Sequence, residues 1–276
     1  MKDISIFAKP ASYKRRSNLP YRHLFRGSSM IRGNQIAEYL GCKLNPIEGY
    51  ENDICIYIKP TTLDHIKDGD WVDIVDGDHI VTWLKDRPLI NTIVNGETSY
   101  NIYRPHIKNK MVVIHPHHCN FDRELRARKE ITTVGYIGGE IVFCYSLEEM
   151  RKQIENIGLN FIYSCGYETR QDVVDFYKHI DIQIVWSHHK FRYQSRGPTK
   201  FVNAASFGIP TVGYPQVCCN EVEGNYIKAN TISELFMELD KLKDPYYHEA
   251  WAKKIDWTEK YHISKRAALY RQLEFA

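Results

Sequence analysis

The sequence predicts an α/β fold made of two Rossmann-like, doubly wound domains that face a central cleft. Short β-rich apolar runs alternate with helical patterns along the whole chain, and this alternation runs through the chain twice. The length of 276 residues suits two domains of about 120–150 residues each. A content of 43% hydrophobic and 26% charged residues is typical of a globular protein with packed cores.

Strands of the first half are expected where apolar runs are rich in β-branched and aromatic residues. These runs are Ile4–Ala8, Ile54–Lys59, Trp71–Val75, Leu89–Val94 and Met111–His115. Gly33–Leu40 predicts a short amphipathic helix that ends at Gly41, because glycine is common just beyond the last helical residue. Two further helical stretches are expected near Leu63–Lys67 and His79–Lys85.

The second half repeats the alternation more regularly. Strands are expected at Thr132–Ile137, Asn160–Ser164, Ile182–Ser187 and Thr211–Tyr214, and helices at Ser146–Ile157, Arg170–His179, Thr199–Phe207 and Ile232–Leu242. Ser146 with Glu149 three residues later forms a capping-box pattern. A boundary near Pro116–Arg128 gives domains of residues 1–120 and 121–276. The helical region at the carboxy terminus is a candidate to pack back on the first domain.

Basic residues gather near the amino terminus, although the formal net charge is only +3. In the first 32 residues Asp3 is the only acid, and the cations include Lys9, Lys14, Arg15, Arg16, Arg22, Arg26 and Arg32. Two interpretations stay open. The segment is either a solvated surface loop or a cationic lip for an anionic acceptor or a phosphate.

The cysteine usage and the hydropathy predict a cytoplasmic protein without a transmembrane segment. Seven cysteines occur without a CxxC pair, and most lie in apolar runs, as Cys55 does. That usage is typical of reduced, buried thiols rather than of a disulfide framework or a zinc site. The amino terminus has no signal-like apolar stretch, and no run approaches the roughly 18 apolar residues that span a bilayer.

Three features of the second half occur in a diagnostic order. Val134-Gly-Tyr-Ile-Gly-Gly139 is a strand with a glycine-rich end, Asp172–Asp181 is a helix leading into a strand that begins with Asp, and Lys200–Pro210 is a helix followed by Gly-Ile-Pro. This order resembles the donor domain of GT-B-fold glycosyltransferases of the group 1 type. The first half is similar to that family only in its general layout.

The resemblance implies a metal-independent glycosyltransferase that moves a sugar from a nucleotide-diphosphate sugar to a hydroxyl of a glycan or glycoconjugate. Residues 1–120 would form the acceptor side, and residues 121–276 would bind the donor. No cofactor is implied, because the nucleotide sugar, with a UDP-sugar as the expected donor, is itself a substrate.

The loop Ser187–Lys200 independently suits a diphosphate. It supplies the cations Lys190, Arg192, Arg196 and Lys200 and then runs into the amino terminus of a helix, where free N–H groups favour anions. Pro198 falls at the helix start, and Thr199 is a candidate cap. The alternative is a basic surface loop. The candidate donor-binding residues are Gly138, Gly139, Ser187, His188, Lys190, Arg192, Arg196, Thr199, Lys200, Asn203, Glu221 and Glu223.

The chain departs from the family at one important pair of positions. The large retaining family has two Glu residues where this sequence has Ser195 and Asn203. Asn203 is therefore expected to hydrogen-bond the ribose or a phosphate. Glu221 or Glu223 is the candidate acceptor for the ribose hydroxyls, with an ordinary loop acid as the alternative for each.

An inverting reaction needs a general base near the acceptor hydroxyl. The candidates are Asp76, Asp78 and His79, which follow an apolar strand. The competing interpretation is a turn and helix cap, because Asp-Gly-Asp-His is also good turn chemistry.

The loop Gly27–Gly33 and the residue directly before it supply the candidate acceptor-binding residues Arg26, Ser28 and Arg32. The alternative is a helix cap flanked by solvated cations.

A metal site is not expected. His115, His117, His118 and Cys119 are nearly contiguous, with Pro116 among them, and this spacing does not match zinc geometry. Linker histidines are the better interpretation.

Other functions remain open from the sequence. The acceptor could be nucleic acid, as in phage enzymes that glucosylate hydroxymethylated pyrimidines of DNA; binding would then depend steeply on salt. A GT-B-fold sugar-nucleotide epimerase and an inactive nucleotide-binding module are further alternatives.

Overall fold

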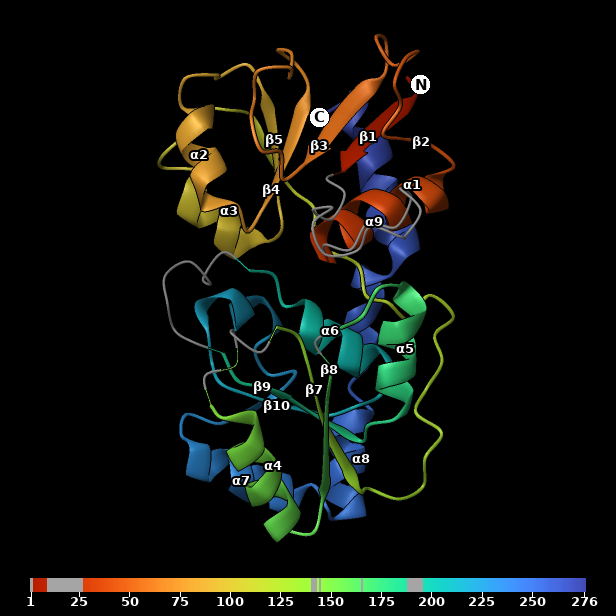
Figure 1. Cartoon of the computed structure of the whole chain (residues 1–276), viewed down its shortest axis with the longest axis vertical. Helices are drawn as coiled ribbons and strands as arrows, with labels where there is room; N and C mark the ends of the chain where they lie inside the picture. The colour runs from red at the N-terminus through yellow and green to blue at the C-terminus, as the bar shows by residue number, and fades with distance from the viewer. Residues whose placement is uncertain (1, 9–26, 140–142, 144, 165, 188–195) are drawn as a thin grey trace. The chain divides into compact units, whose positions relative to one another are not determined.

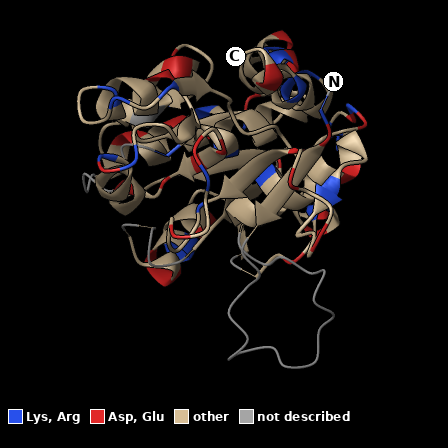
Figure 2. Cartoon of the chain, turned by 90° about the horizontal axis from the view of Figure 1, so that it is seen from above, with Lys and Arg blue, Asp and Glu red and all other residues tan. Residues whose placement is uncertain are grey.

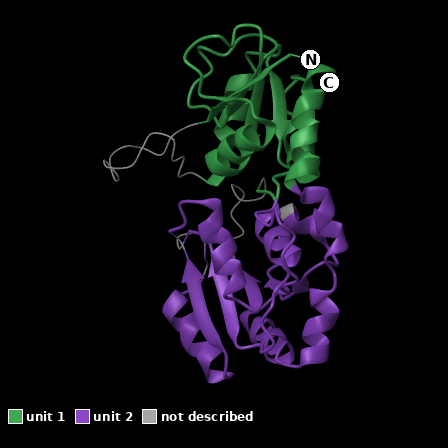
Figure 3. Ribbon diagram, turned by 90° about the vertical axis from the view of Figure 1, so that its right-hand side faces the viewer, with its two compact units in different colours: residues 1–117, 192–197, 263–276 green, residues 118–191, 198–262 purple. Residues whose placement is uncertain are grey.

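The computed structural model describes residues 2–8, 27–139, 143, 145–164, 166–187 and 196–276. These residues form two compact units, coloured separately in Figure 3. Unit 1 comprises the described residues of 1–117, 192–197 and 263–276, and unit 2 those of 118–191 and 198–262. Within the described ranges, no helix combines the length and the apolarity that crossing a bilayer requires.

Unit 1 contains a six-stranded sheet in which all neighbouring strands are parallel. Its order is β2-β1-β3-β4-β5-β6. The strands are β1 (Ile4–Ala8), β2 (Lys43–Leu44), β3 (Ile54–Ile58), β4 (Trp71–Val75), β5 (Asn91–Val94) and β6 (Met111–Val113). Every residue of β3 and β4 is buried, as expected for strands that helices cover on both faces.

The helices of unit 1 lie at the two sides of this sheet (Figure 1). They are the π-helical turn η2 (Ser29–Asn34), α1 (Gln35–Leu40), α2 (Asp78–Leu84), α3 (Glu97–Tyr103) and α9 (Ile263–Arg271), with the short η7 (Gln272–Glu274) at the end. Gly33 allows η2 to approach β1 closely, since a Cβ there would lie 2.5 Å from the Cβ of Ala8. Gly41 ends α1 with a φ of 67°, as the sequence predicts.

Unit 2 contains a five-stranded parallel sheet in the order β11-β10-β9-β7-β8. Its strands are β7 (Thr133–Ile137), β8 (Asn160–Ser164), β9 (Ile182–Val185), β10 (Thr211–Gly213) and β11 (Ile227–Lys228). The helices are α4 (Leu147–Asn156), α5 (Arg170–Lys178), α6 (Thr199–Ser206), α7 (Ile232–Lys241) and α8 (Pro245–Ala252), with 3₁₀ turns η5 (Val217–Val222) and η6 (Asp256–Tyr261).

Two apolar clusters cover the two faces of the second sheet. Residues of α4 and α7, such as Met150 and Leu239, pack with β7 and β9 on one face. Residues of α5 and α6, such as Tyr177 and Ala204, pack on the other. The helix starts are set locally, because the Ser146 side chain accepts from the Glu149 N–H, and Thr169 forms a full capping box with Asp172.

The predicted α/β architecture with two parallel sheets is confirmed, with some elements different. The helix expected near Leu63–Lys67 is a turn, and the helix α3 and the short edge strands β2 and β11 were not predicted. Short elements such as these carry too few residues for a clear periodicity.

Most of the predicted basic lip lies outside the described residues: Lys9, Lys14, Arg15, Arg16, Arg22 and Arg26. In the described part of the chain, basic and acidic positions are interspersed (Figure 2).

Candidate functional site

The topology of unit 2 marks one point of its sheet for ligand binding. The chain passes from β7 to β8 on one side and continues through β9, β10 and β11 on the other. Open α/β sheets bind ligands beyond the carboxyl ends of their strands where the strand order reverses in this way. Here that point lies between β7, which ends at Ile137, and β9, which ends at Val185.

Lys200, Gly138 and Tyr136 come together at this point. The Lys200 Nζ lies over the Tyr136 ring, 4.6 Å from its centroid. A Cβ on Gly138 would lie 2.5 Å from that Nζ and 3.2 Å from the Tyr136 hydroxyl oxygen. The predicted donor residues Gly138 and Lys200 are therefore in contact, although a long stretch of sequence separates them.

Gly138 has a backbone conformation that favours glycine. Its φ is 142°, and its N–H donates to the Ser164 carbonyl at 2.9 Å, which continues the β7–β8 pairing by one residue. The Tyr136 hydroxyl donates to the Gly139 carbonyl at 3.0 Å, so the next residue is also fixed. Gly139 itself is exposed. This strand end leaves backbone accessible beside a cation.

The helix α6 begins at the same point. Pro198 is its N-cap residue and Thr199 its first helical residue, so the expectation that Thr199 caps the helix is wrong. The described residues place no capping side chain and no acid in the first turn. The positive end of α6 is therefore not neutralised by its own sequence. Ser187 is buried after β9 and forms an isolated bridge with Phe143.

Asn203 points into unit 2. Its Oδ1 accepts from the Cys119 N–H at 2.9 Å, and it is only 8% exposed. Asn203 therefore holds the segment after His118 against α6, and the predicted contact with ribose or phosphate stays untested.

The two candidate ribose acids lie on and just after η5. Glu223 is exposed and forms an ion pair with Lys228, whereas Glu221 is half-buried. The predicted donor residues His188, Lys190 and Arg192 and the predicted acceptor residue Arg26 lie outside the described residues.

Unit 1 carries a second group of polar side chains at its strand ends. Asp76 follows β4, Lys59 follows β3, and Arg196 comes from the segment before α6. The Asp76 Oδ1 pairs with Lys59, and its Oδ2 lies 3.8 Å from the Arg196 Nε. The predicted base Asp76 and the predicted donor residue Arg196 therefore meet within unit 1. Asp76 remains 27% exposed, so it can still be reached by a ligand.

The backbone around Asp76 is strained. The β4–β5 register shifts between Asp73 and Val75, and Val75 has a φ of 55°. Lys59, directly after the neighbouring strand β3, has a φ of 46°. Left-handed conformations are unfavourable for residues with a Cβ, above all for β-branched Val, and such strain and bulges concentrate at functional sites. This irregularity changes the direction of the backbone directly before Asp76.

The other two candidate bases lie on α2. Asp78 is its first residue and accepts from the Tyr103 hydroxyl. His79 is exposed, and its ring meets Trp83 edge-on at 5.0 Å. Asp78 thus lies in the first turn of α2, and Gly77 is the N-cap residue. This arrangement agrees with the competing interpretation of a turn and a helix cap.

Arg32 is 2% exposed and lies inside unit 1 rather than on its surface. Its guanidinium pairs with the buried Asp73 and donates to the Ile114 carbonyl at 2.7 Å. The Tyr270 hydroxyl of α9 hydrogen-bonds the same carboxylate, and burial raises the pKa of that hydroxyl. Ser28 precedes η2 and is half-buried, with no side-chain cap bond. Acceptor binding by Arg32 and Ser28 stays a prediction.

The linker histidines are engaged with the protein itself. The His117 Nε2 lies 2.9 Å from the Ile31 carbonyl, and His118 packs edge-on against His262 at 5.5 Å. Among the described residues, no group of three or more His, Cys, Asp and Glu is placed to hold a metal ion.

Sequence reasoning missed Lys59 and Tyr136. Both follow from a simple signal, because each is a polar or aromatic residue at the carboxyl end of an apolar strand. What the sequence could not supply is the partner of each residue.

No protein-family model matches the chain, and no curated protein matches it by sequence. Solved structures do match its fold. The chain is similar to WaaG, a glycosyltransferase involved in lipopolysaccharide biosynthesis, with 9% identity, a TM-score of 0.62, and coverage of 98% of this chain and 99% of that one. It is similar to Anabaena Alr3699/HepE in complex with UDP and glucose, with 11% identity, a TM-score of 0.59 and 100% coverage of both chains.

A third match is TarM, with 14% identity and a TM-score of 0.53. The alignment covers 82% of this chain but only 55% of TarM, and this chain likewise spans 57% of the matched chain of the GtfA/B complex. Identities this low establish the fold alone. The chain therefore has the two-domain GT-B fold of glycosyltransferases.

Proposed function

We propose that the protein is a glycosyltransferase that moves a sugar from a nucleotide-diphosphate sugar to a hydroxyl of a glycan or glycoconjugate. The observation that carries this proposal is the contact of Lys200 with Gly138 at the switch point of the unit 2 sheet. It combines an ammonium group, an accessible backbone and the start of a helix, which are the parts that recognise a diphosphate.

The donor diphosphate would lie across the end of β7. The exposed Gly139 leaves backbone accessible there, and Lys200 and the start of α6 would offset the negative charge that grows on the leaving phosphate. We assign this charge stabilisation to the chain's own groups and not to a metal ion, so chelation by EDTA should leave activity unchanged. The likeness to a HepE structure that holds UDP and glucose makes UDP-glucose the first donor to test.

We assign the general base to Asp76 in unit 1. In an inverting transfer, the carboxylate would take the proton of the acceptor hydroxyl as its oxygen attacks the sugar carbon and the bond to the diphosphate breaks. Lys59 and Arg196 would hold the carboxylate in a fixed orientation.

A cytoplasmic location is part of the proposal. The described cysteines Cys42, Cys55, Cys119 and Cys219 are free thiols. Burial raises the pKa of Cys55 to about 11 and that of Cys119 to about 12. Unreactive, unpaired thiols of this kind are usual in a reducing compartment.

Isothermal titration with UDP, UDP-glucose and GDP-glucose tests donor binding. We expect a uridine nucleotide to bind and Lys200→Ala to weaken its affinity by roughly tenfold or more, as for the loss of a charge-assisted contact. Lys178→Ala, which removes an exposed lysine of α5, is the matched control and should bind like the unaltered protein. If no nucleotide binds at millimolar concentration, the proposal fails.

A further inference from the structure

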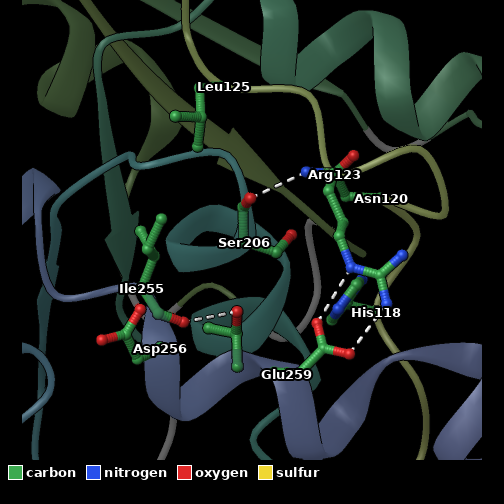
Figure 4. A pocket seen from close by; sticks show the side chains of 9 residues that line it. His118, Asn120, Arg123, Leu125, Ser206, Ile255, Asp256 and Glu259 are labelled. Carbon is green, nitrogen blue, oxygen red and sulfur yellow. Dashed lines mark hydrogen bonds and ion pairs between the residues drawn. The ribbon is translucent and has the colours of Figure 1, made fainter.

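Unit 2 contains a pocket of about 420 Å³ that lies apart from the Lys200 site. Three segments line it: residues 118–125, Ser206 at the end of α6, and residues 255–259 (Figure 4). We call it the crossover pocket, because two of these segments lie next to the points where the chain changes units. One comes directly after the chain enters unit 2 at His118, and the other comes shortly before it leaves unit 2 after His262. Lys200 is the second residue of α6 and Ser206 the last, so roughly 9 Å of helix axis separates the two residues.

The walls of the crossover pocket are held by hydrogen bonds between its segments. Arg123 forms a forked pair with Glu259, with distances of 3.0 and 2.8 Å (Figure 4). The Asn120 Nδ2 donates to the carbonyls of Glu124 and Ser206 at 2.8 and 2.7 Å. Both crossing segments are thereby fixed to each other and to α6, so a ligand would meet a preformed surface.

Arg123 is held in an unfavourable backbone conformation. Its φ is 54°, which is a left-handed value for a residue with a long side chain. Such strain clusters at ligand clamps and active sites. The forked pair with Glu259 fixes this residue at the rim, where its side chain is 55% exposed.

The charge of the lining excludes some ligand classes. Arg123 contributes one positive charge, and Asp256 and Glu259 contribute two negative ones, so one net negative charge remains. A phosphate or carboxylate ligand would be repelled by this net charge. The described residues of this pocket are also not arranged to hold a metal ion.

The hydrogen-bonding groups of the lining fit a ligand whose groups donate hydrogen bonds. The hydroxyls of Thr258 and Ser206 donate to the carbonyls of Ile255 and Asn203, each at 2.7 Å, and so present lone pairs. The exposed Asp256 carboxylate accepts only. Leu125 and Ile255 add aliphatic surface near Ser206 (Figure 4).

We infer that the crossover pocket binds a neutral saccharide. Vicinal sugar hydroxyls would donate to Asp256 and Glu259, and the apolar C–H face of the ring would lie against Leu125 and Ile255. The volume is within the usual range of about 300–1,000 Å³ for small-molecule sites. This site is distinct from the donor site, and the inference does not depend on the proposed reaction.

Saturation-transfer NMR on the full-length protein tests the inference. The neutral probes are glucose, galactose, mannose, N-acetylglucosamine, maltose and cellobiose. Inorganic phosphate is the anionic comparison ligand, and spermidine is the cationic one. We expect at least one neutral sugar to bind with millimolar affinity. Sugar binding should be unchanged when UDP is present at saturation, and also in the Lys200→Ala variant. Loss of the proposed donor site would therefore not remove the sugar signal.

Two variants assign the binding to the pocket. Asp256→Ala removes an exposed carboxylate, and we expect it to weaken sugar binding by about tenfold, as for the loss of hydrogen bonds to a charged group. Leu125→Trp should abolish binding by filling the pocket. Asp240→Ala, an exposed acid of α7 that does not line the pocket, should bind normally. The inference is overturned if no neutral sugar binds, if only phosphate or spermidine binds, or if both pocket variants bind like the unaltered protein.

Discussion

The ammonium group of Lys200 lies over the face of the Tyr136 ring, 4.6 Å from the ring centroid. The contact joins the first turn of α6 to the second-last residue of β7. A cation in this position is attracted to the ring by about 0.5–2 kcal/mol. Because the Tyr136 hydroxyl is itself anchored to the Gly139 carbonyl, the ring holds Lys200 beside the glycine-rich strand end. This contact leads to the first prediction.

Gly138→Ala should weaken binding of UDP by tenfold or more. The new methyl group would lie 2.5 Å from the Lys200 Nζ and displace it, and a misplacement of about 1 Å can cost up to roughly 100-fold in function. The measurement is isothermal titration with UDP.

Two glycine controls separate displacement from strain. Gly158→Ala introduces strain at a φ of 81° with no atom within 4 Å, and Gly166→Ala adds a methyl group in open space. Both should keep their UDP affinity, although Gly158→Ala should lose about 1–3 kcal/mol of stability. Equal loss of affinity in Gly138→Ala and Gly158→Ala would mean that strain, and not the Lys200 contact, matters.

Asp76→Asn should lower kcat for UDP release from UDP-glucose by about 100-fold or more, because general-base catalysis typically contributes 10²–10⁴. The affinity for UDP should stay unchanged, since the donor is assigned to unit 2. A coupled UDP-release assay, with titration of UDP alongside, gives both quantities.

Asp78→Asn is the comparison for Asp76. Asp78 accepts a hydrogen bond from Tyr103 in the first turn of α2, so its loss should affect stability more than turnover. If Asp78→Asn abolishes turnover and Asp76→Asn does not, the base is Asp78.

Asp181→Asn should destabilise the protein by about 3–5 kcal/mol, because it removes one partner of a buried charge network. The carboxylate is fully buried and accepts from the Arg126 Nε and from the N–H groups of Thr132 and Thr133, each at 2.8 Å. Urea unfolding measures the change. Asp175→Asn, at an exposed position on α5, should change stability by less than about 0.5 kcal/mol.

The free energy of unfolding should fall as the pH drops below about 6.5, because of His248. Burial lowers the pKa of His248 below its usual 6.5, against the hydrogen bond to the Asp181 carbonyl at 2.8 Å, which raises it. The folded state therefore binds this proton less readily than the unfolded chain, so its contribution is present above pH 6.5 and is lost as the pH falls. For one proton, the slope cannot exceed about 1.4 kcal/mol per pH unit.

Urea unfolding at pH 7.5 and 5.5 checks this dependence. His248→Gln keeps a donor for the Asp181 carbonyl but cannot titrate there, so it should flatten the curve. The same change at the exposed His79 should leave the curve as it is. An unaltered slope in His248→Gln would contradict the assignment.

Several elements could be predicted from sequence because their causes are local. The strands β1, β4 and β8 have the predicted bounds, and α4 begins after Ser146 as its capping pattern indicates. Gly41 ends α1 for an equally local reason. Edge strands of two residues, such as β2, depend instead on pairing with a neighbour that is distant in sequence.

The candidate site was only partly predictable. The order of motifs in the second half indicated Gly138 and Lys200, and the structure brings these two together. The sequence gives no sign that Arg196 lies near Asp76, or that Lys59 pairs with that carboxylate.

By itself, the sequence determined the alternation of strands and helices, the helix ends and the motif order that indicates a nucleotide-sugar site. Only the tertiary structure decided which polar side chains are enclosed and which remain accessible. Arg32 and Asn203 are buried with protein partners, whereas Asp76 remains partly exposed at a strand end. The physical reason is that secondary structure depends on neighbours a few residues away, whereas burial and charge pairing depend on segments that meet only when the sheet forms.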